Sequence, residues 1–276
     1  MSGFKSPLDI YKILNKSNCR QCQVATCMAF AALVFKGERT LDGCPHIDQD
    51  LLEQLGIETV KSDVPEENEE EALRQLKSEI TTVDFPAAAE RLGAQFVGDK
   101  LAIKCLGKNF FVDSEGNIDS ECHVNAWLKM PLLSYIVSSK GSDPRGDWVK
   151  FNQLKDGTSW NRFFQKRCEE PLKRIADADE KLFFDIAQVF GGIKQSEDSS
   201  ADWSLILHPL PKVPFLISYW NPEDDFDSDL KILFDKSTDS NLKVETIYLL
   251  TRGIAEMFKL IMQRHSATGQ LKINID

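Results

Sequence analysis

The 276-residue sequence lacks the short motifs that mark nucleotide binding and several kinds of hydrolysis. Gly191-Gly192 is typical of a helix end and fits neither G-x-G-x-x-G nor G-x-x-x-x-G-K. No G-x-S-x-G or H-E-x-x-H segment is present, and no C-x-x-C pair occurs beyond residue 22. These absences argue against nucleotide-driven chemistry.

Signals for export and membrane insertion are missing as well. The first nine residues contain no apolar stretch followed by a small-residue cleavage site. The longest nearby apolar run, Met28–Phe35, is too short to cross a bilayer. We therefore expect a cytoplasmic location and no membrane insertion.

The chain has fewer basic residues than acidic ones. The chain has 33 Lys and Arg against 43 Asp and Glu, a net charge of −10, and most of the excess lies after residue 60. Such an acidic body argues against nucleic acid and anionic membrane surfaces as partners. It suits docking onto a basic protein surface, and it equally suits simple solubility.

The cysteines are the residues that point most directly to a specific chemistry. Four of the seven cysteines, Cys19, Cys22, Cys27 and Cys44, follow the pattern C-x2-C-x4-C-x16-C, and Pro45 comes directly after the last. Cytosolic thiols stay reduced and the total is odd, so a disulfide framework is the weakest interpretation. Four clustered thiolates are what a 4Fe–4S cluster needs. Zinc is the main alternative, although structural zinc sites usually carry two C-x2-C knuckles and only one is present here.

The residues around these cysteines favour a buried anionic group. Thr26 is a good N-cap for a helix that starts at Cys27 and ends at Gly37, which places the Cys27 thiolate at the positive end of the helix dipole. Cys19 and Cys22 fit a tight turn whose N–H groups point at the sulfurs. Four basic residues lie nearby and either offset cluster charge or are simply solvated: Lys16, Arg20, Lys36 and Arg39.

The segments 7–14 and 18–31, followed by Cys44-Pro45, resemble the four-cysteine module at the front of the corrinoid iron–sulfur protein's large subunit. The same module occurs in electron-transfer subunits of anaerobes. The resemblance covers residues 5 to about 50 and implies that the four cysteines ligate one 4Fe–4S cluster. This chain departs from the family where glycines usually follow the first two cysteines, since it has Arg20 and Gln23. The corrinoid protein's barrel domains have no visible counterpart, so cobalamin binding is not assigned.

The chain is expected to be an α+β protein with a small helical iron–sulfur domain followed by a larger mixed α+β domain. Residues 1–60 form the predicted cluster domain, 61–80 an acidic linker and helix, and 81–276 the α+β domain. Helices are predicted at 85–92, 123–138, 160–175, 180–190 and 243–264. Strands are predicted at 95–97, 101–106, 109–112, 205–207 and 215–220, with prolines separating the last two. Strands grouped apart from helices indicate α+β.

The larger part resembles a second family. The segments Gly146-Asp-Trp, Phe190-Gly-Gly, Ala201-Asp-Trp, Leu210-Pro-Lys-Val-Pro and Leu233-Phe-Asp are similar to an anaerobe-associated domain of unknown function. That domain often stands behind the same four-cysteine module. The similarity spans about residues 90 to 262, and it implies an architecture but no activity.

Candidate site residues in this part are few. His208, in a predicted proline-flanked loop, is the best single candidate, with Asp202 and Asp235 as companions. Three further candidates have simpler interpretations. The side chains of Cys122 and His123 are expected to point in different directions because the residues are adjacent, and His46 is expected to be an ordinary loop histidine. An acidic run that could hold a hard cation is expected to be a solvated loop: Glu223, Asp224, Asp225, Asp227 and Asp229.

Three functions remain open. The first is single-electron transfer through one 4Fe–4S cluster to or from a protein partner, which by resemblance is a corrinoid protein or another anaerobic metalloenzyme. The second is a redox enzyme whose active site lies around His208, with the cluster as electron donor in cis. The third is a binding or assembly protein in which the cluster, or a zinc ion, is purely structural.

Overall fold

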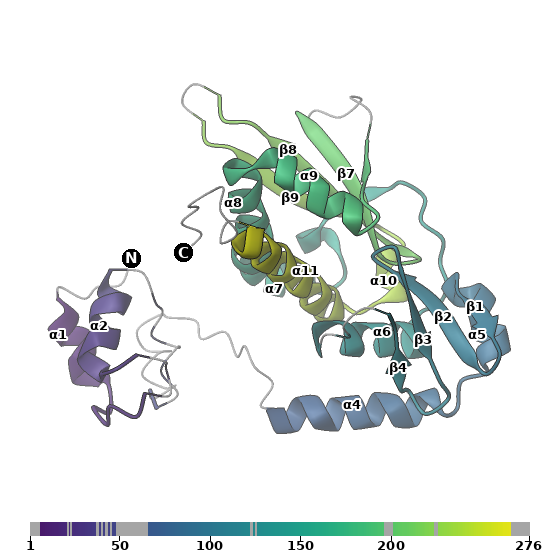
Figure 1. Cartoon of the computed structure of the whole chain (residues 1–276), viewed down its shortest axis with the longest axis horizontal. Helices are drawn as coiled ribbons and strands as arrows, with labels where there is room; N and C mark the ends of the chain where they lie inside the picture. The colour runs from purple at the N-terminus through teal and green to yellow at the C-terminus, as the bar shows by residue number, and fades with distance from the viewer. Residues whose placement is uncertain are drawn as a thin grey trace. The chain divides into compact units, whose positions relative to one another are not determined.

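The structure is a computed structural model that describes residues 6–20, 22, 24–36, 39, 41, 44, 46–47, 66–121, 124, 126–195, 201–223 and 226–265. The chain forms two compact units, Met1–Glu67 and Asn68–Ile275 (Figure 1). The first is small and its described elements are helices, and the second combines helices with two sheets. This confirms the α+β prediction of a small helical domain followed by a larger mixed one.

The N-terminal unit packs two short helices, α1 (Pro7–Ile13) and α2 (Cys27–Phe35). Helix α2 begins where the sequence predicts, because the Thr26 hydroxyl accepts a hydrogen bond from the Ala29 N–H at 3.1 Å. The core between the helices consists of a few side chains: Ile10, Leu14, Phe30, Ala31 and Leu41 together with Cys27 and Cys44. So small an apolar core gives limited stability by itself.

The C-terminal unit contains both helices and strands. Its helices are α4 (Glu66–Ile80), α5 (Phe85–Leu92), α6 (Ala126–Ser138), α7 (Gly157–Phe164), α8 (Glu170–Ala178), α9 (Glu180–Val189), α10 (Thr238–Asn241) and α11 (Val244–His265). A 3₁₀ turn, η2 (Phe151–Gln153), and a π-helical turn, η3 (Gln165–Glu169), accompany them. The strands are β1 (Gln95–Val97), β2 (Lys100–Cys105), β3 (Lys108–Val112), β4 (Ile118–Asp119), β5 (Trp148–Lys150), β6 (Ile193–Lys194), β7 (Trp203–Leu210), β8 (Val213–Trp220) and β9 (Asp229–Asp235).

Two antiparallel sheets organise this unit. Strands β1-β2-β3-β4 form a four-stranded meander, and β5-β9-β8-β7-β6 form a five-stranded sheet. The sheets are linked where the Leu106 N–H donates to the His208 carbonyl at 3.0 Å. Both sheets contribute to one hydrophobic core.

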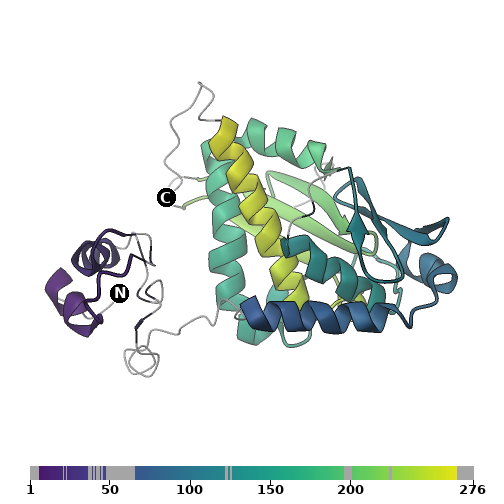
Figure 2. The same ribbon diagram turned by 60° about the horizontal axis from the view of Figure 1, so that its bottom comes forward.

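Helix α11 is the central helix of the unit. It lies between α8 and α6 and packs on both (Figure 2). The close approach to α6 depends on Gly253, because a Cβ there would overlap the Trp127 indole ring. No helix within the described ranges is both long and apolar enough to cross a membrane.

Two sequence predictions are wrong in this unit. The prolines do not separate two short strands: Pro209 lies in β7 and Pro214 in β8, and the strands are joined by the two-residue turn Pro211-Lys212. Proline lacks the N–H of a ladder hydrogen bond, and the pairing register shifts between Leu207 and Leu210 to accommodate Pro209. The helix predicted at 160–175 is interrupted by the π-helical turn η3.

Candidate metal centre

Cys19 lies in a loop in which alternate residues have positive φ angles. Lys16, Asn18 and Arg20 have φ angles of 60°, 50° and 63°, a left-handed conformation that glycine adopts most readily. Left-handed residues let backbone N–H groups turn toward a common anion. Arg20 directly follows Cys19, where the resemblance to the four-cysteine module leads us to expect glycine. The backbone therefore has the shape that glycine would favour, although the residue is arginine.

Asn18 connects this loop to helix α2. Its side-chain Oδ1 accepts a hydrogen bond from the Cys27 N–H at 2.7 Å. Its own backbone N–H donates to the Cys27 Sγ at 3.3 Å. This reciprocal pair fixes the Cys27 sulfur beside the loop that carries Cys19, and it supplies one N–H donor to that sulfur.

Cys27 is the first residue of α2. The first turn of a helix has unpaired N–H groups and the positive end of the helix dipole, so a thiolate is stabilised there. The prediction that places Cys27 in this turn is confirmed. The predicted end of the helix at Gly37 lies outside the described residues, and α2 ends at Phe35.

The four thiols differ in their exposure to solvent. Cys27 and Cys44 are buried, at 7% and 6% exposed, and pack into the core of the unit. Cys22 is half-buried, and Cys19 is exposed. One side of the cysteine group therefore lies in the protein and the other faces solvent.

The four cysteines are neighbours in space. Burial raises the pKa of the Cys44 thiol, a backbone hydrogen bond from His46 lowers it, and charge on Cys22, Cys27 and Cys19 raises it further. Within the residues that the structure describes, however, no three His, Cys, Asp or Glu side chains are close enough to hold a single metal ion. The influence of the other three thiols on Cys44 indicates that the four cysteines lie in one part of the N-terminal unit.

The nearby polar residues do not add ligands. The side chains of Lys16, Arg20, Lys36 and Arg39 are all exposed to solvent. Lys16 Nζ lies 5.7 Å from the centre of the Tyr11 ring. His46 is exposed and acts on Cys44 through its backbone.

Comparison with known families decides the identity of the larger part. Residues 84–257 match the profile of a family described as "Domain of unknown function (DUF3786)". The chain belongs to the DUF3786 family. Residues 14–46 match a second family, described as "Putative Fe-S cluster". The order of an iron–sulfur motif followed by this domain of unknown function is as the sequence predicts.

Curated relatives match only short stretches. A protein of Methanothermobacter thermautotrophicus named acetyl-CoA decarbonylase/synthase complex subunit gamma is 43% identical over 67 residues, 22% of this chain and 15% of the relative. The corrinoid/iron-sulfur protein large subunit of Moorella thermoacetica is 44% identical over 48 residues, 17% of this chain and 11% of the relative. The chain thus spans a small fraction of these relatives. The predicted resemblance to the corrinoid protein's large subunit is confirmed. No solved structure matches.

The candidate residues of the DUF3786 domain are not gathered into one site. His208 is exposed and lies within strand β7, so its prediction as a loop residue is wrong. Asp202 precedes β7, and its Oδ2 accepts from the Asn221 N–H at 2.7 Å. The pairing of Trp203 with Tyr219 and of Leu207 with Phe215 places Asp202 and His208 toward opposite ends of the β7–β8 pair.

Asp235 organises a loop. It is 1% exposed, and its Oδ2 accepts hydrogen bonds from the N–H groups of Arg145 at 2.9 Å and Gly146 at 2.6 Å. Its Oδ1 accepts from the Ser237 N–H at 2.9 Å. Burial raises the pKa of Asp235, but the hydrogen bonds from Ser237, Arg145 and Gly146 outweigh it and hold the pKa below its ordinary value. Asp235, a candidate site residue from the sequence, thus holds the backbone N–H groups of two neighbouring segments.

Among the remaining candidates, those that the structure describes form no metal site. In the acidic run, Glu223 and Phe226 exchange backbone hydrogen bonds, and Asp229 pairs with Lys231 Nζ at 2.8 Å. Asp224, Asp225, Cys122 and His123 lie outside the described residues.

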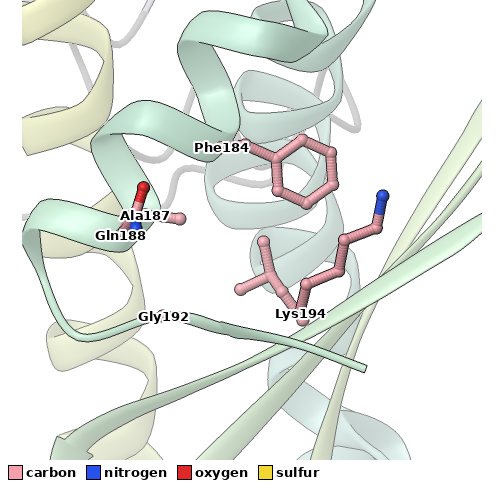
Figure 3. A pocket seen from close by; sticks show the side chains of 6 residues that line it. Phe184, Ala187, Gln188, Gly192 and Lys194 are labelled. Carbon is pink, nitrogen blue, oxygen red and sulfur yellow. The ribbon is translucent and has the colours of Figure 1, made fainter. Parts of the chain in front are cut away.

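A small surface pocket lies between α9 and the edge strand β6 (Figure 3). Its volume is about 270 Å³, and Lys194 Nζ lies 4.8 Å from the centre of the Phe184 ring at its side. Phe184, Ala187, Gln188, Gly192, Lys194 and Leu205 line it. None of the candidate metal-binding or catalytic residues predicted from the sequence is among them.

Proposed function

We propose that this chain binds one 4Fe–4S cluster through Cys19, Cys22, Cys27 and Cys44 and transfers single electrons to or from a protein partner. When bound, such a cluster takes up and releases one electron at a time. The observation that carries the proposal is the arrangement of the thiols, two buried in the core of the unit and one exposed. Residues 14–46 match an iron–sulfur family, which supports the cofactor class.

The spacing of the cysteines and the family that residues 14–46 match favour a cluster over a single zinc ion. Zinc draws four ligands to about 2.3 Å from one point, whereas a 4Fe–4S cluster takes one thiolate on each of four separated irons. The match of residues 14–46 to a family described as a putative Fe-S cluster supports the second arrangement. The N–H of Asn18 donates to the Cys27 sulfur, and such bonds tune the reduction potential of iron–sulfur proteins.

The exposure of the thiols supports electron transfer over a purely structural role. Cys27 and Cys44 anchor the group in the core, while Cys19 lies at the surface. A partner could approach the Cys19 side closely without unfolding the unit. The names of the curated relatives place them in an acetyl-CoA decarbonylase/synthase complex and in a corrinoid/iron-sulfur protein. We therefore propose a corrinoid protein or another metalloenzyme of anaerobic metabolism as the partner.

A redox titration of the anaerobically purified chain, followed by EPR, tests this function. A reversible one-electron couple is expected, and Cys27→Ser should abolish its signal. Cys105→Ala is the matched control, because Cys105 is 1% exposed in the core of the other unit and should leave the signal unchanged. A cluster with no accessible couple would make the site structural and overturn the electron-transfer proposal.

A further inference from the structure

The pocket between α9 and β6 has no part in the proposed function, which lies in the N-terminal unit (Figure 3). Its volume is about 270 Å³, and all the residues that line it belong to the DUF3786 domain. A cavity of roughly 150 Å³ is enough to hold benzene in an apolar protein interior. The pocket therefore has room for one ring or a short chain together with a small polar group.

The wall of this pocket is largely apolar. Phe184 and Ala187 lie three residues apart on α9 and so share one face of the helix. On the sheet, Lys194 of β6 pairs with Leu205 of β7, which places their side chains next to each other on the same face. All four residues line the pocket. Removing such apolar surface from water favours binding of a ligand with an apolar body.

Gly192 brings β6 close to the end of α9. Its N–H donates to the Ala187 carbonyl at 2.7 Å, and a Cβ at this position would lie 2.7 Å from the same oxygen. The Gly191 N–H donates to the Gln188 carbonyl at 3.0 Å. These bonds occupy carbonyls that would otherwise be left unpaired at a helix end. The pocket wall at this end thus offers few acceptors to a ligand, which disfavours sugars and other ligands rich in hydroxyl groups.

Among the described residues that line the pocket, Lys194 alone carries a charge. Its Nζ lies 4.8 Å from the centre of the Phe184 ring, a cation–π contact that holds the ammonium group over the ring (Figure 3). It forms no ion pair with a carboxylate of the described residues. Gln188 adds an amide with two N–H donors. In a protein of net charge −10, an unpaired lysine beside an apolar pocket suits a ligand with a single negative charge.

We propose that this pocket binds a small monocarboxylic acid whose body is one ring or a short apolar chain. Lys194 Nζ donates a charge-assisted hydrogen bond to the carboxylate, and the Gln188 amide is a second donor. Phe184, Ala187 and Leu205 contact the apolar body. Carboxylate and body are both needed, because a lysine exposed to solvent gains little from an ion pair alone. The site uses none of the cysteines, so it stands whether or not a cluster is bound.

Calorimetric titration of the full chain with benzoate, and separately with hexanoate, tests the proposal at constant ionic strength set by chloride. Saturable binding of at least one acid is expected, and the comparison shows whether a ring or a chain fits. Acetate lacks the apolar body, and benzyl alcohol and hexanol lack the charge, so each should bind about tenfold more weakly or worse. Absence of binding by both acids, or a neutral alcohol that binds as well as its acid, would overturn the proposal.

Variants of two exposed lining residues locate the site. Lys194→Gln removes the charge and should weaken binding about tenfold, the usual effect of losing a charge-assisted hydrogen bond. Gln188→Glu should weaken it as well, because a second carboxylate repels the ligand. Lys181→Gln is the control, since Lys181 is an exposed lysine of α9 that does not line the pocket. All three replace exposed side chains, so the fold should persist. Binding that Lys194→Gln and Gln188→Glu leave unchanged would contradict the assignment.

Discussion

Asn18 and Cys27 hold each other through two hydrogen bonds that run in opposite directions. The asparagine Oδ1 accepts from the Cys27 N–H at 2.7 Å, and the asparagine N–H donates to the Cys27 Sγ at 3.3 Å. One residue thus fixes both the backbone and the sulfur of a proposed ligand. Its left-handed φ of 50° is one that asparagine tolerates better than most residues.

Asn18→Ala tests this pair. The loss of the side-chain acceptor and of a residue suited to positive φ should cost about 1 kcal/mol of stability in the N-terminal unit. With the Asn18 N–H less firmly held against the sulfur, the reduction potential should become more negative. EPR-monitored titration measures the shift. Asn15→Ala is the control, since the Asn15 side chain accepts from the Ser17 N–H in the exposed part of the loop, and an equal shift there would contradict the assignment.

Arg20→Gly should stabilise the cysteine loop. Arg20 has a φ of 63°, which costs an ordinary residue about 1 kcal/mol and glycine almost nothing. The variant should lose its metal to a chelator more slowly than the unmodified chain does. Arg20→Ala separates strain from charge, because it removes the guanidinium but keeps a Cβ at the same φ. If Arg20→Ala gives the same gain as Arg20→Gly, the effect comes from charge and the strain argument is wrong.

Asp235→Asn should destabilise the C-terminal unit by about 1–3 kcal/mol at neutral pH, because the amide cannot accept three N–H bonds as a carboxylate does. The pKa of Asp235 lies below its ordinary value, so its contribution is present above pH about 4 and is lost as pH falls through the lower folded-state pKa. Urea unfolding at several pH values should show the gap between variant and unmodified chain closing in acid.

The matched control for that series is Asp143→Asn. The Asp143 side chain is 81% exposed and pairs with Lys212, so its replacement should change stability little at any pH. A pH-independent loss in Asp235→Asn would show that packing, and not the charged hydrogen bonds, is responsible.

Gly253→Ala should lower the stability of the C-terminal unit, although the same change stabilises most helices. In an open helix this change stabilises by about 1 kcal/mol, because alanine is the better helix former. Here the added methyl group would overlap the Trp127 ring of α6, so a loss of about 1–3 kcal/mol is expected. Thermal unfolding measures it. An increase in the unfolding temperature would mean that α11 and α6 do not approach as closely as described.

Local signals predicted much of the fold. Thr26 and Asp84 each cap a helix through the side chain, and the two helices begin at the predicted residues, Cys27 and Phe85. The helix Phe85–Leu92 and the strand Gln95–Val97 have the predicted bounds, because Gly93 ends the helix in a left-handed conformation. Such boundaries depend on residues that are adjacent in sequence.

Features that depend on distant residues could not be predicted. The prolines of β7 and β8 are compatible with strands only because the register shifts at Pro209. The short strands β5 and β6 exist because longer neighbours pair with them. The turn η3 meets α11 through helix packing, and a sequence read residue by residue has no signal for that. The cysteine motif was visible because its members lie close together in the chain.

The most direct test of the central claim is the metal and sulfide content of the anaerobically purified chain, measured with its EPR spectrum. The account predicts about four irons and four acid-labile sulfides per chain, with no stoichiometric zinc. It also predicts that replacing any of Cys19, Cys22, Cys27 or Cys44 by serine lowers the iron content, whereas Cys105→Ala does not. One zinc ion per chain without sulfide would contradict it.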